Sequence, residues 1–229
     1  MKMGFEYIKR NLDSLTEEIK TLEKKYGREI TLVAVTKRGS DEELIALAEC
    51  GIANIGENRP QELRRRGDLL HSAGHSPKLH EIGNLQRNKV KMIIEDVTLI
   101  HSLDSLPLAE EIDKQARKAG RVVDVLVEIN SACESQKGGI MPSDAEEFIT
   151  ELGRYENIRV RGLMTMGPVV DDPEELRPYF RLTRELYDRL NRKFDFGGGI
   201  LSMGMSDSYA VAIEEGATLV RVGRKLFNR

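Results

Sequence analysis

The chain has 229 residues, of which 40% are hydrophobic and 32% charged, a mixture typical of a soluble globular protein with a substantial core. Its 35 Lys and Arg residues against 38 Asp and Glu leave a formal charge of -3, which gives no reason to expect a nucleic acid or an anionic membrane as partner. No apolar run approaches the roughly eighteen residues of a membrane span, and the charged N-terminus is unlike a signal peptide. Cys50 and Cys133 make neither a disulfide framework nor a zinc site, so the sequence predicts a metal-free protein of the reducing cytoplasm.

The predicted elements alternate along the chain after an N-terminal helix over 5–26. A capping box at Ser40–Glu43 and a turn glycine at Gly51 bound the next helix, and Pro142 with a second box at Ser143–Glu146 starts a later one. The remaining helices are predicted at 61–70, 86–94, 106–119, 173–192 and 208–215. Short apolar runs predict strands at 30–35, 53–55, 79–82, 98–101, 122–129, 159–164, 200–203 and 218–222.

These strands are apolar rather than alternating, which indicates parallel strands covered on both faces. Eight of them, nearly all followed by helices, have the size and rhythm of a (β/α)8 (TIM) barrel with an extra N-terminal helix. A doubly wound open sheet is the alternative that periodicity leaves open. No composition break or long linker suggests a second domain, so one domain over 1–229 is expected.

In such a barrel, functional residues gather where strands end and the following loops begin. Lys37 comes two residues after the apolar run that ends at Val35, so its side chain would point into the barrel mouth beside a hydrophobic wall. Burial there would lower the pKa of the amine and favour Schiff-base formation. A solvated lysine that merely opens a loop explains the same spacing. Asn58 and His80, after the next two strands, are polar groups suited to a planar heterocycle, or to satisfying local backbone.

The last two strand ends carry a second signal. Barrel enzymes often hold phosphate with the loops after strands seven and eight. Ser202–Asp207 offers a hydroxyl and a small-residue turn at a helix start, and Arg221–Arg224 offers a glycine followed by another N–H donor. Either could be an ordinary turn. Together, at this position in the fold, they predict a phosphate site.

Six ordered motifs resemble the pyridoxal 5′-phosphate (PLP) homeostasis proteins, also called YggS-like or PROSC-like proteins, which are similar to the barrel domain of alanine racemase. The resemblance runs from about Phe5 to Phe227. The motifs are Val33–Lys37, Gly56–Asn58, His80–Lys89, Arg161–Met164, Met203–Ser206 and Val220–Gly223.

The resemblance implies that Lys37 carries PLP as a Schiff base. It also implies that Ser206, Gly223 and the backbone of Arg224 hold the phosphate and that Arg221 faces the pyridine nitrogen. Asn58, His80 and Met164 are the further cofactor contacts it suggests. A guanidinium can only donate to that nitrogen, which makes the bound ring a poor electron sink.

Three positions depart from the family pattern. Glu81 stands where an aromatic residue is usual, so the wall beside His80 is expected to be more polar. Arg224 replaces a small hydroxyl residue and adds a charge near the phosphate or solvent. Asn228 replaces a C-terminal glycine and can itself adopt a left-handed conformation.

Three functions compete. The resemblance favours a PLP carrier without strong catalytic activity, with apo PLP-dependent enzymes as partners. A monomer is expected, because a barrel without the racemase's second domain lacks the main contact of that dimer. The runner-up is a fold-type III amino-acid racemase, which needs a second acid/base on the other face of the cofactor. Tyr209 is the only local candidate for that role, although it is expected to pack on its helix. The domain that supplies this group in racemases is not expected in the few residues after Val222. A Schiff-base lyase acting on sugar phosphates without PLP is the third.

Overall fold

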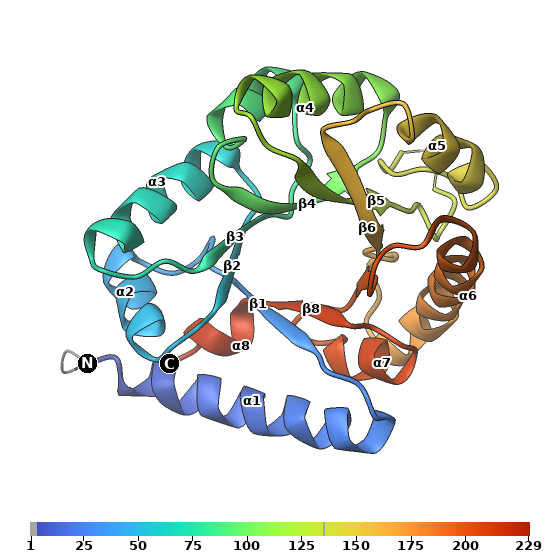
Figure 1. Ribbon diagram of the computed structural model, residues 1–229. Coiled ribbons are helices and arrows are strands. Elements are labelled where there is room, and N and C mark those ends of the chain that lie inside the picture. The colour runs from blue at the N-terminus through green and yellow to red at the C-terminus, as the bar shows by residue number, and fades with distance from the viewer. Residues whose placement is uncertain (1–3, 135) are drawn as a thin grey trace.

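The apolar runs form strands that close into a ring. Across residues 4–134 and 136–229, which the computed structural model describes, each strand pairs in parallel with the next and β8 pairs back with β1. The strands are β1 (Thr31–Val35), β2 (Asn54–Glu57), β3 (Lys78–Glu81), β4 (Val97–Leu103), β5 (Val123–Glu128), β6 (Ile158–Met164), β7 (Ile200–Ser202) and β8 (Leu219–Val222). Figure 1 shows the strands in the middle and the helices around them. The barrel prediction is confirmed, and the open sheet is excluded.

The helices follow the predicted order with local differences. They are α1 (Glu6–Tyr26), α2 (Asp41–Glu49), α3 (Pro60–Ser72), the 3-10 helix η1 (Arg87–Met92), α4 (Leu106–Lys118), α5 (Ala145–Leu152), the 3-10 helix η2 (Pro173–Leu176), α6 (Arg177–Phe194), α7 (Tyr209–Glu214) and α8 (Arg224–Phe227). The segment predicted as a helix over 86–94 is therefore a shorter 3-10 turn. The short α8 was not predicted. No helix in the described ranges is long and apolar enough to span a bilayer.

The two predicted capping boxes behave differently. At α2, the Ser40 hydroxyl accepts the Glu43 backbone N–H at 3.2 Å, and the Glu43 carboxylate accepts the Ser40 N–H at 2.7 Å, as predicted. At α5, the Ser143 hydroxyl instead donates to the Asp144 carboxylate at 2.7 Å, so the second box is wrong. The Ser143 hydroxyl that was predicted to cap the helix is hydrogen-bonded to the neighbouring Asp144 carboxylate instead.

The barrel has two hydrophobic regions because successive side chains on a strand face opposite sides. The larger core lies between the strands and the surrounding helices. The smaller one fills the barrel interior and comprises Val33, Leu99, Leu126, Met164 and Leu219. Polar side chains share that interior, and they are the ones that bear on function.

Helix α1 closes the outer layer beside α2, α7 and α8 (Figure 1). Helix α1 meets the C-terminal residues there, where the Asn11 side-chain amide donates to the Asn228 carbonyl at 2.7 Å. Asn228 itself has φ −74° and ψ 130°, so it does not use the left-handed conformation that an asparagine can adopt.

Candidate functional site

The loops after β7 and β8 converge on one hydroxyl oxygen. The Ser206 Oγ accepts the backbone N–H of Gly223 at 3.2 Å and that of Arg224 at 3.0 Å. Ser206 is buried, and Gly223 immediately precedes α8. Two backbone donors that point at one oxygen are the arrangement that binds an oxyanion. We call Ser206, Gly223 and Arg224 the β7–β8 cradle.

Close packing explains the glycines of these loops. A Cβ on Gly223 would lie 2.9 Å from the Val35 carbonyl oxygen, so β1 and not only a ligand demands a small residue there. Gly204 has φ +91°, and a Cβ on it would lie 2.6 Å from the Ala212 methyl. The cradle therefore lies directly beside the end of β1, two residues before Lys37.

The side chain of Arg224 takes no part in the hydrogen bonds of the cradle. It is exposed and forms an ion pair with Asp207 in the preceding loop. The charge added at this position is therefore matched locally, while its backbone N–H remains directed at Ser206.

Arg221 occupies the interior below the cradle and is 3% exposed. Its guanidinium donates to the carbonyl and the hydroxyl of Ser202 and, at 3.1 Å, to the carbonyl of Thr165. Burial lowers the pKa of Arg221 to about 10, and the Glu128 carboxylate acts against that shift. The group stays charged at neutral pH. Three of its five N–H donors are taken, and the other two have no partner among the described residues.

Lys37 is exposed, which contradicts the expected burial beside a hydrophobic wall. The chain turns directly after β1, closed by a hydrogen bond of 2.9 Å from the Gly39 N–H to the Thr36 carbonyl. This turn interrupts the strand alternation that predicted an inward side chain. Lys37 instead lines a cavity of about 360 Å³ with the similarly exposed Asn58. The structure thus brings Lys37 and Asn58 together at the mouth, next to the strand that contacts the cradle.

A buried ion pair supports the Lys37 turn, and sequence reasoning missed it. Arg66 on α3 is the last of three consecutive arginines, a run typical of a solvated helix face, yet it is 6% exposed. It donates to the carbonyls of Thr36 at 2.6 Å and Gly39 at 3.0 Å, and its Nε lies 3.3 Å from the Glu57 carboxylate. Glu57 in turn accepts the Thr36 hydroxyl at 2.5 Å. An apolar spacing of α3 that places position 66 inward is the signal that could have identified it.

Comparison with known proteins agrees with this geometry. The family model described as alanine racemase, N-terminal domain, matches residues 10–228. A pyridoxal phosphate homeostasis protein of Aquifex aeolicus is 44% identical, covering 86% of this chain and 85% of its own. One from Helicobacter pylori is 34% identical over 96% and 97%. The chain belongs to the pyridoxal phosphate homeostasis protein family.

Solved structures share the barrel fold. PipY of Synechococcus elongatus, in a structure described as having PLP bound, superposes with a TM-score of 0.84 at 29% identity, over 96% of this chain and all of PipY. Alanine racemase of Clostridium difficile superposes with a TM-score of 0.75 at 20% identity, over 98% of this chain and 56% of the racemase. The second similarity shows the shared barrel alone.

In this member of the homeostasis protein family, His80 and Met164 lie inside the barrel and not at its surface. His80 is 4% exposed, and its two ring nitrogens face His101 at 3.0 Å and the Asn54 side-chain oxygen at 3.2 Å. Met164 is 1% exposed in the interior apolar cluster. A direct contact of either with a cofactor stays a prediction, and the geometry favours an indirect role for His80.

Glu81 was expected to make the wall beside His80 more polar, but it does not line that wall. Because it follows His80 on β3, its side chain faces outward, where it is fully buried close to Glu57. Burial raises the pKa of Glu81 to about 8, although the Gly83 N–H that it accepts at 3.1 Å opposes the shift. The glutamate that replaces the usual aromatic residue therefore places a protonated acid between the strands and the outer helices. It does not make the site itself more polar.

Glu128, at the end of β5, is a further residue that the sequence did not single out. It borders a second cavity, of about 260 Å³, at the mouth over β3, β5 and β6. Burial and the nearby Asp104 raise its pKa to about 7, against the opposing effect of Arg221. Its place two residues after the inward-facing Leu126 is the signal for an interior carboxylate.

Proposed function

We propose that this chain binds PLP as a Schiff base on Lys37 and takes part in PLP homeostasis by holding and delivering the cofactor. The observation that carries the proposal is the β7–β8 cradle, in which two backbone donors converge beside the strand that leads to Lys37. Family membership and the PLP described for PipY support it.

The described residues offer a group for each part of such a ligand. The cradle would take the phosphate, Arg221 would donate to the ring nitrogen, and Lys37 is an accessible primary amine for the aldehyde. When bound, PLP supplies an aldehyde and an electron-accepting ring. Arg221 stays protonated, so it would donate a hydrogen bond to the ring nitrogen without giving up its proton. An unprotonated ring nitrogen limits the electron acceptance of the ring.

The proposed function does not include fast amino-acid racemization. Tyr209, the local candidate for a second acid/base, is 4% exposed, and its hydroxyl donates to Glu18 of α1 while accepting from Lys225 at 3.0 Å. Its side chain therefore points to the outer helices and is already engaged. The residues that the site does present bind and orient a cofactor.

Borohydride reduction tests the Lys37 assignment. Reduction of the PLP-loaded protein should fix the cofactor mass on the peptide that contains Lys37. Lys37→Arg should abolish labelling with little effect on the free energy of unfolding, because the side chain is exposed. Lys78→Arg, which alters an exposed lysine at the opposite end of the barrel, is the matched control and should label normally. An unlabelled wild-type protein, or label elsewhere in the chain, would refute the assignment.

Two further measurements separate carrier from racemase. Incubation of the loaded protein with L-alanine in deuterated water should give no deuterium at the α-position at turnover rates. Transfer of PLP to an apo-enzyme should be faster than free dissociation allows. The opposite pair of results would favour the racemase.

A further inference from the structure

A continuous line of polar side chains crosses the apolar barrel interior from Arg221. The Ser202 hydroxyl accepts a hydrogen bond from the Arg221 guanidinium, and the same Oγ lies 3.0 Å from His101 Nδ1. His101 Nε2 lies 3.0 Å from His80 Nδ1, and His80 Nε2 lies 3.2 Å from Asn54 Oδ1. These side chains come from β8, β7, β4, β3 and β2, so the line joins strands on opposite sides of the ring.

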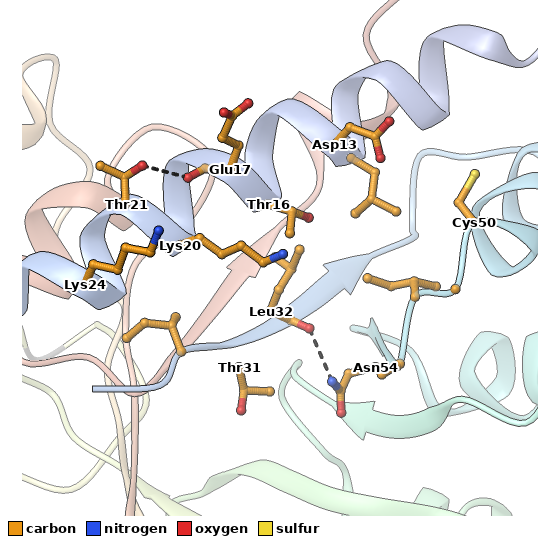
Figure 2. Close-up of a pocket in the computed structure, with 15 residues that line it drawn as sticks. Asp13, Thr16, Glu17, Lys20, Thr21, Lys24, Thr31, Leu32, Cys50 and Asn54 are labelled. Atoms are coloured by element: carbon orange, nitrogen blue, oxygen red, sulfur yellow. Dashed lines mark hydrogen bonds between the residues drawn. The ribbon is translucent and has the colours of Figure 1, made fainter. Parts of the chain in front are cut away.

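The far end of the line reaches the other end of the barrel. The Asn54 side-chain amide donates to the Leu32 carbonyl at 3.4 Å, and both residues border a cavity of about 810 Å³ beside α1. Figure 2 shows this hydrogen bond at the foot of the cavity, below the Lys20 side chain. The line therefore extends from a solvent-accessible groove at the start of β1 and β2 to the guanidinium below the cradle.

The direction of every hydrogen bond is fixed at the Arg221 end. A guanidinium has only donors, so the Ser202 hydroxyl must accept from it. The hydroxyl hydrogen then has His101 Nδ1 as its acceptor, and no other acceptor for it lies among the described residues. With Nδ1 accepting, His101 carries its proton on Nε2 and donates to His80 Nδ1. His80 likewise carries its proton on Nε2 and donates to Asn54 Oδ1.

The Asn54 end requires the same direction independently. The carbonyl of Leu32 can only accept, so the side chain of Asn54 must place its NH₂ toward Leu32 and its oxygen toward His80. Turning the amide round would put two acceptors face to face. Both ends therefore impose one polarity, and each hydrogen bond between neighbouring members of the line has one donor and one acceptor.

The line also has a definite charge. Burial lowers the pKa of His80 to about 4 and that of His101 well below its ordinary value. Both imidazoles are neutral at pH 7, so Arg221 is the one charged member. It is held by a hydroxyl and two carbonyls, and no carboxylate is hydrogen-bonded to it in the described ranges.

We propose that Ser202, His101, His80 and Asn54 form a one-way hydrogen-bond line that positions Arg221, with both imidazoles neutral and protonated on Nε2. By fixing the guanidinium through neutral groups, the line leaves its charge and two donors directed at a ligand. These four are positioning residues. The part that concerns PLP rests on the proposed function, whereas the tautomers do not.

Side-chain ¹⁵N NMR of the PLP-free wild-type protein tests the line without any variant. His101 and His80 should both show an unprotonated Nδ1 and a protonated Nε2 at pH 7, with His71 and His75 as internal references. A proton on Nδ1 of either ring, or a cationic imidazole, overturns the proposal whether or not the protein binds PLP.

Ser202→Ala tests the link to Arg221, and this chain offers a matched control. Ser102 follows His101 on β4, is equally buried, and its hydroxyl has no partner among the described residues. Ser202→Ala should weaken PLP binding about ten-fold, as expected for one hydrogen bond to a charged group. It should also shift the ¹⁵N resonance of the pyridine nitrogen of labelled PLP. Ser102→Ala should do neither, and Ser202→Thr, which keeps the hydroxyl, should restore both.

Equal effects of Ser202→Ala and Ser102→Ala would overturn the positioning role and leave only packing. If wild-type protein binds no PLP, the proposed function fails, and the tautomer measurement still decides the line. The expected tautomers together with an unshifted pyridine resonance in Ser202→Ala would support the hydrogen-bond line. They would refute the proposal that the line acts on the ligand through Arg221.

Discussion

The two most buried arginines of the site lie on opposite sides of the barrel wall and are held in opposite ways. Arg66, outside the barrel, lies 3.3 Å from the Glu57 carboxylate and binds the two carbonyls of the Lys37 turn. Arg221, inside, binds a hydroxyl and two carbonyls without a carboxylate. A buried charge with a counter-ion can be purely structural. A buried charge held only by neutral groups is available to an anionic or electron-rich ligand. Binding of such a ligand offsets the desolvation free energy of the buried charge.

The largest expected effect comes from removing each arginine in the PLP-free protein. Arg66→Met should cost about 3–5 kcal/mol of unfolding free energy, because it leaves Glu57 buried and unpaired. Arg221→Met should cost less, because it removes a desolvated charge together with its hydrogen bonds. Urea denaturation measures both.

Two variants control this comparison. Arg65→Met, on the exposed side of the same helix, should stay within about 1 kcal/mol of wild type. Glu57→Gln combined with Arg66→Met should recover part of the Arg66→Met loss. A loss for Arg221→Met as large as that for Arg66→Met would remove the proposed distinction.

The second effect concerns Glu81, the acid beside the Arg66 pair. Its pKa in the folded protein is about 8, above an unfolded value near 4.3. The stabilisation by the protonated form is therefore complete below about pH 4 and declines as pH rises toward 8. Relative to Glu81→Gln, wild type should lose up to about 1.4 kcal/mol per pH unit in that window and level off above it.

Urea denaturation between pH 5 and pH 9 measures this slope. Glu156→Gln, at an exposed glutamate, should show no such difference from wild type. A Glu81→Gln difference that does not change with pH would mean that Glu81 is ionised when buried, with Arg66 neutralising a second carboxylate. Arg66 would then be surrounded by two ionised carboxylates, Glu57 and Glu81, whereas Arg221 is hydrogen-bonded to none among the described residues.

The sequence predicted the barrel more completely than the site because the two depend on different information. Buried strands and the Ser40 cap follow from local residue types, and the convergence of the last two loops follows from fold position. The burial of Lys37 failed because one turn hydrogen bond, Gly39 to Thr36, interrupts the strand alternation. The two carbonyls of this turn are bound by Arg66, which lies 30 residues after Thr36 and 27 after Gly39, and no local pattern connects it to them.

The interior line shows what a closer sequence analysis could have found. His101 lies two residues after Leu99 and Ser202 two after Ile200, so each continues the inward-facing side of its strand. A polar residue at such a position, in an otherwise apolar strand, is the available signal. Which polar residues meet across the ring depends on the register of several strand pairs, and that information is absent from any one strand.

The smallest effect gives the most direct decision on whether Arg221 has a counter-ion. Among the described residues, Glu128 is the carboxylate whose charge raises the pKa of Arg221. If the two were a true ion pair, the pKa of Glu128 would be lowered, and Glu128→Gln would destabilise the protein above neutral pH. Burial instead raises that pKa to about 7, so stabilisation by the protonated form is lost as pH rises from about 4 toward 7.

Glu128→Gln should therefore be about as stable as wild type near pH 5 and more stable at pH 8.5. The gain should be on the order of 1 kcal/mol, because Glu128 is only half-buried and borders a cavity. Urea denaturation of the PLP-free protein at the two pH values measures it. A loss of stability at pH 8.5 would reverse the sign, make Glu128 the partner of Arg221, and place both arginines in the same structural class.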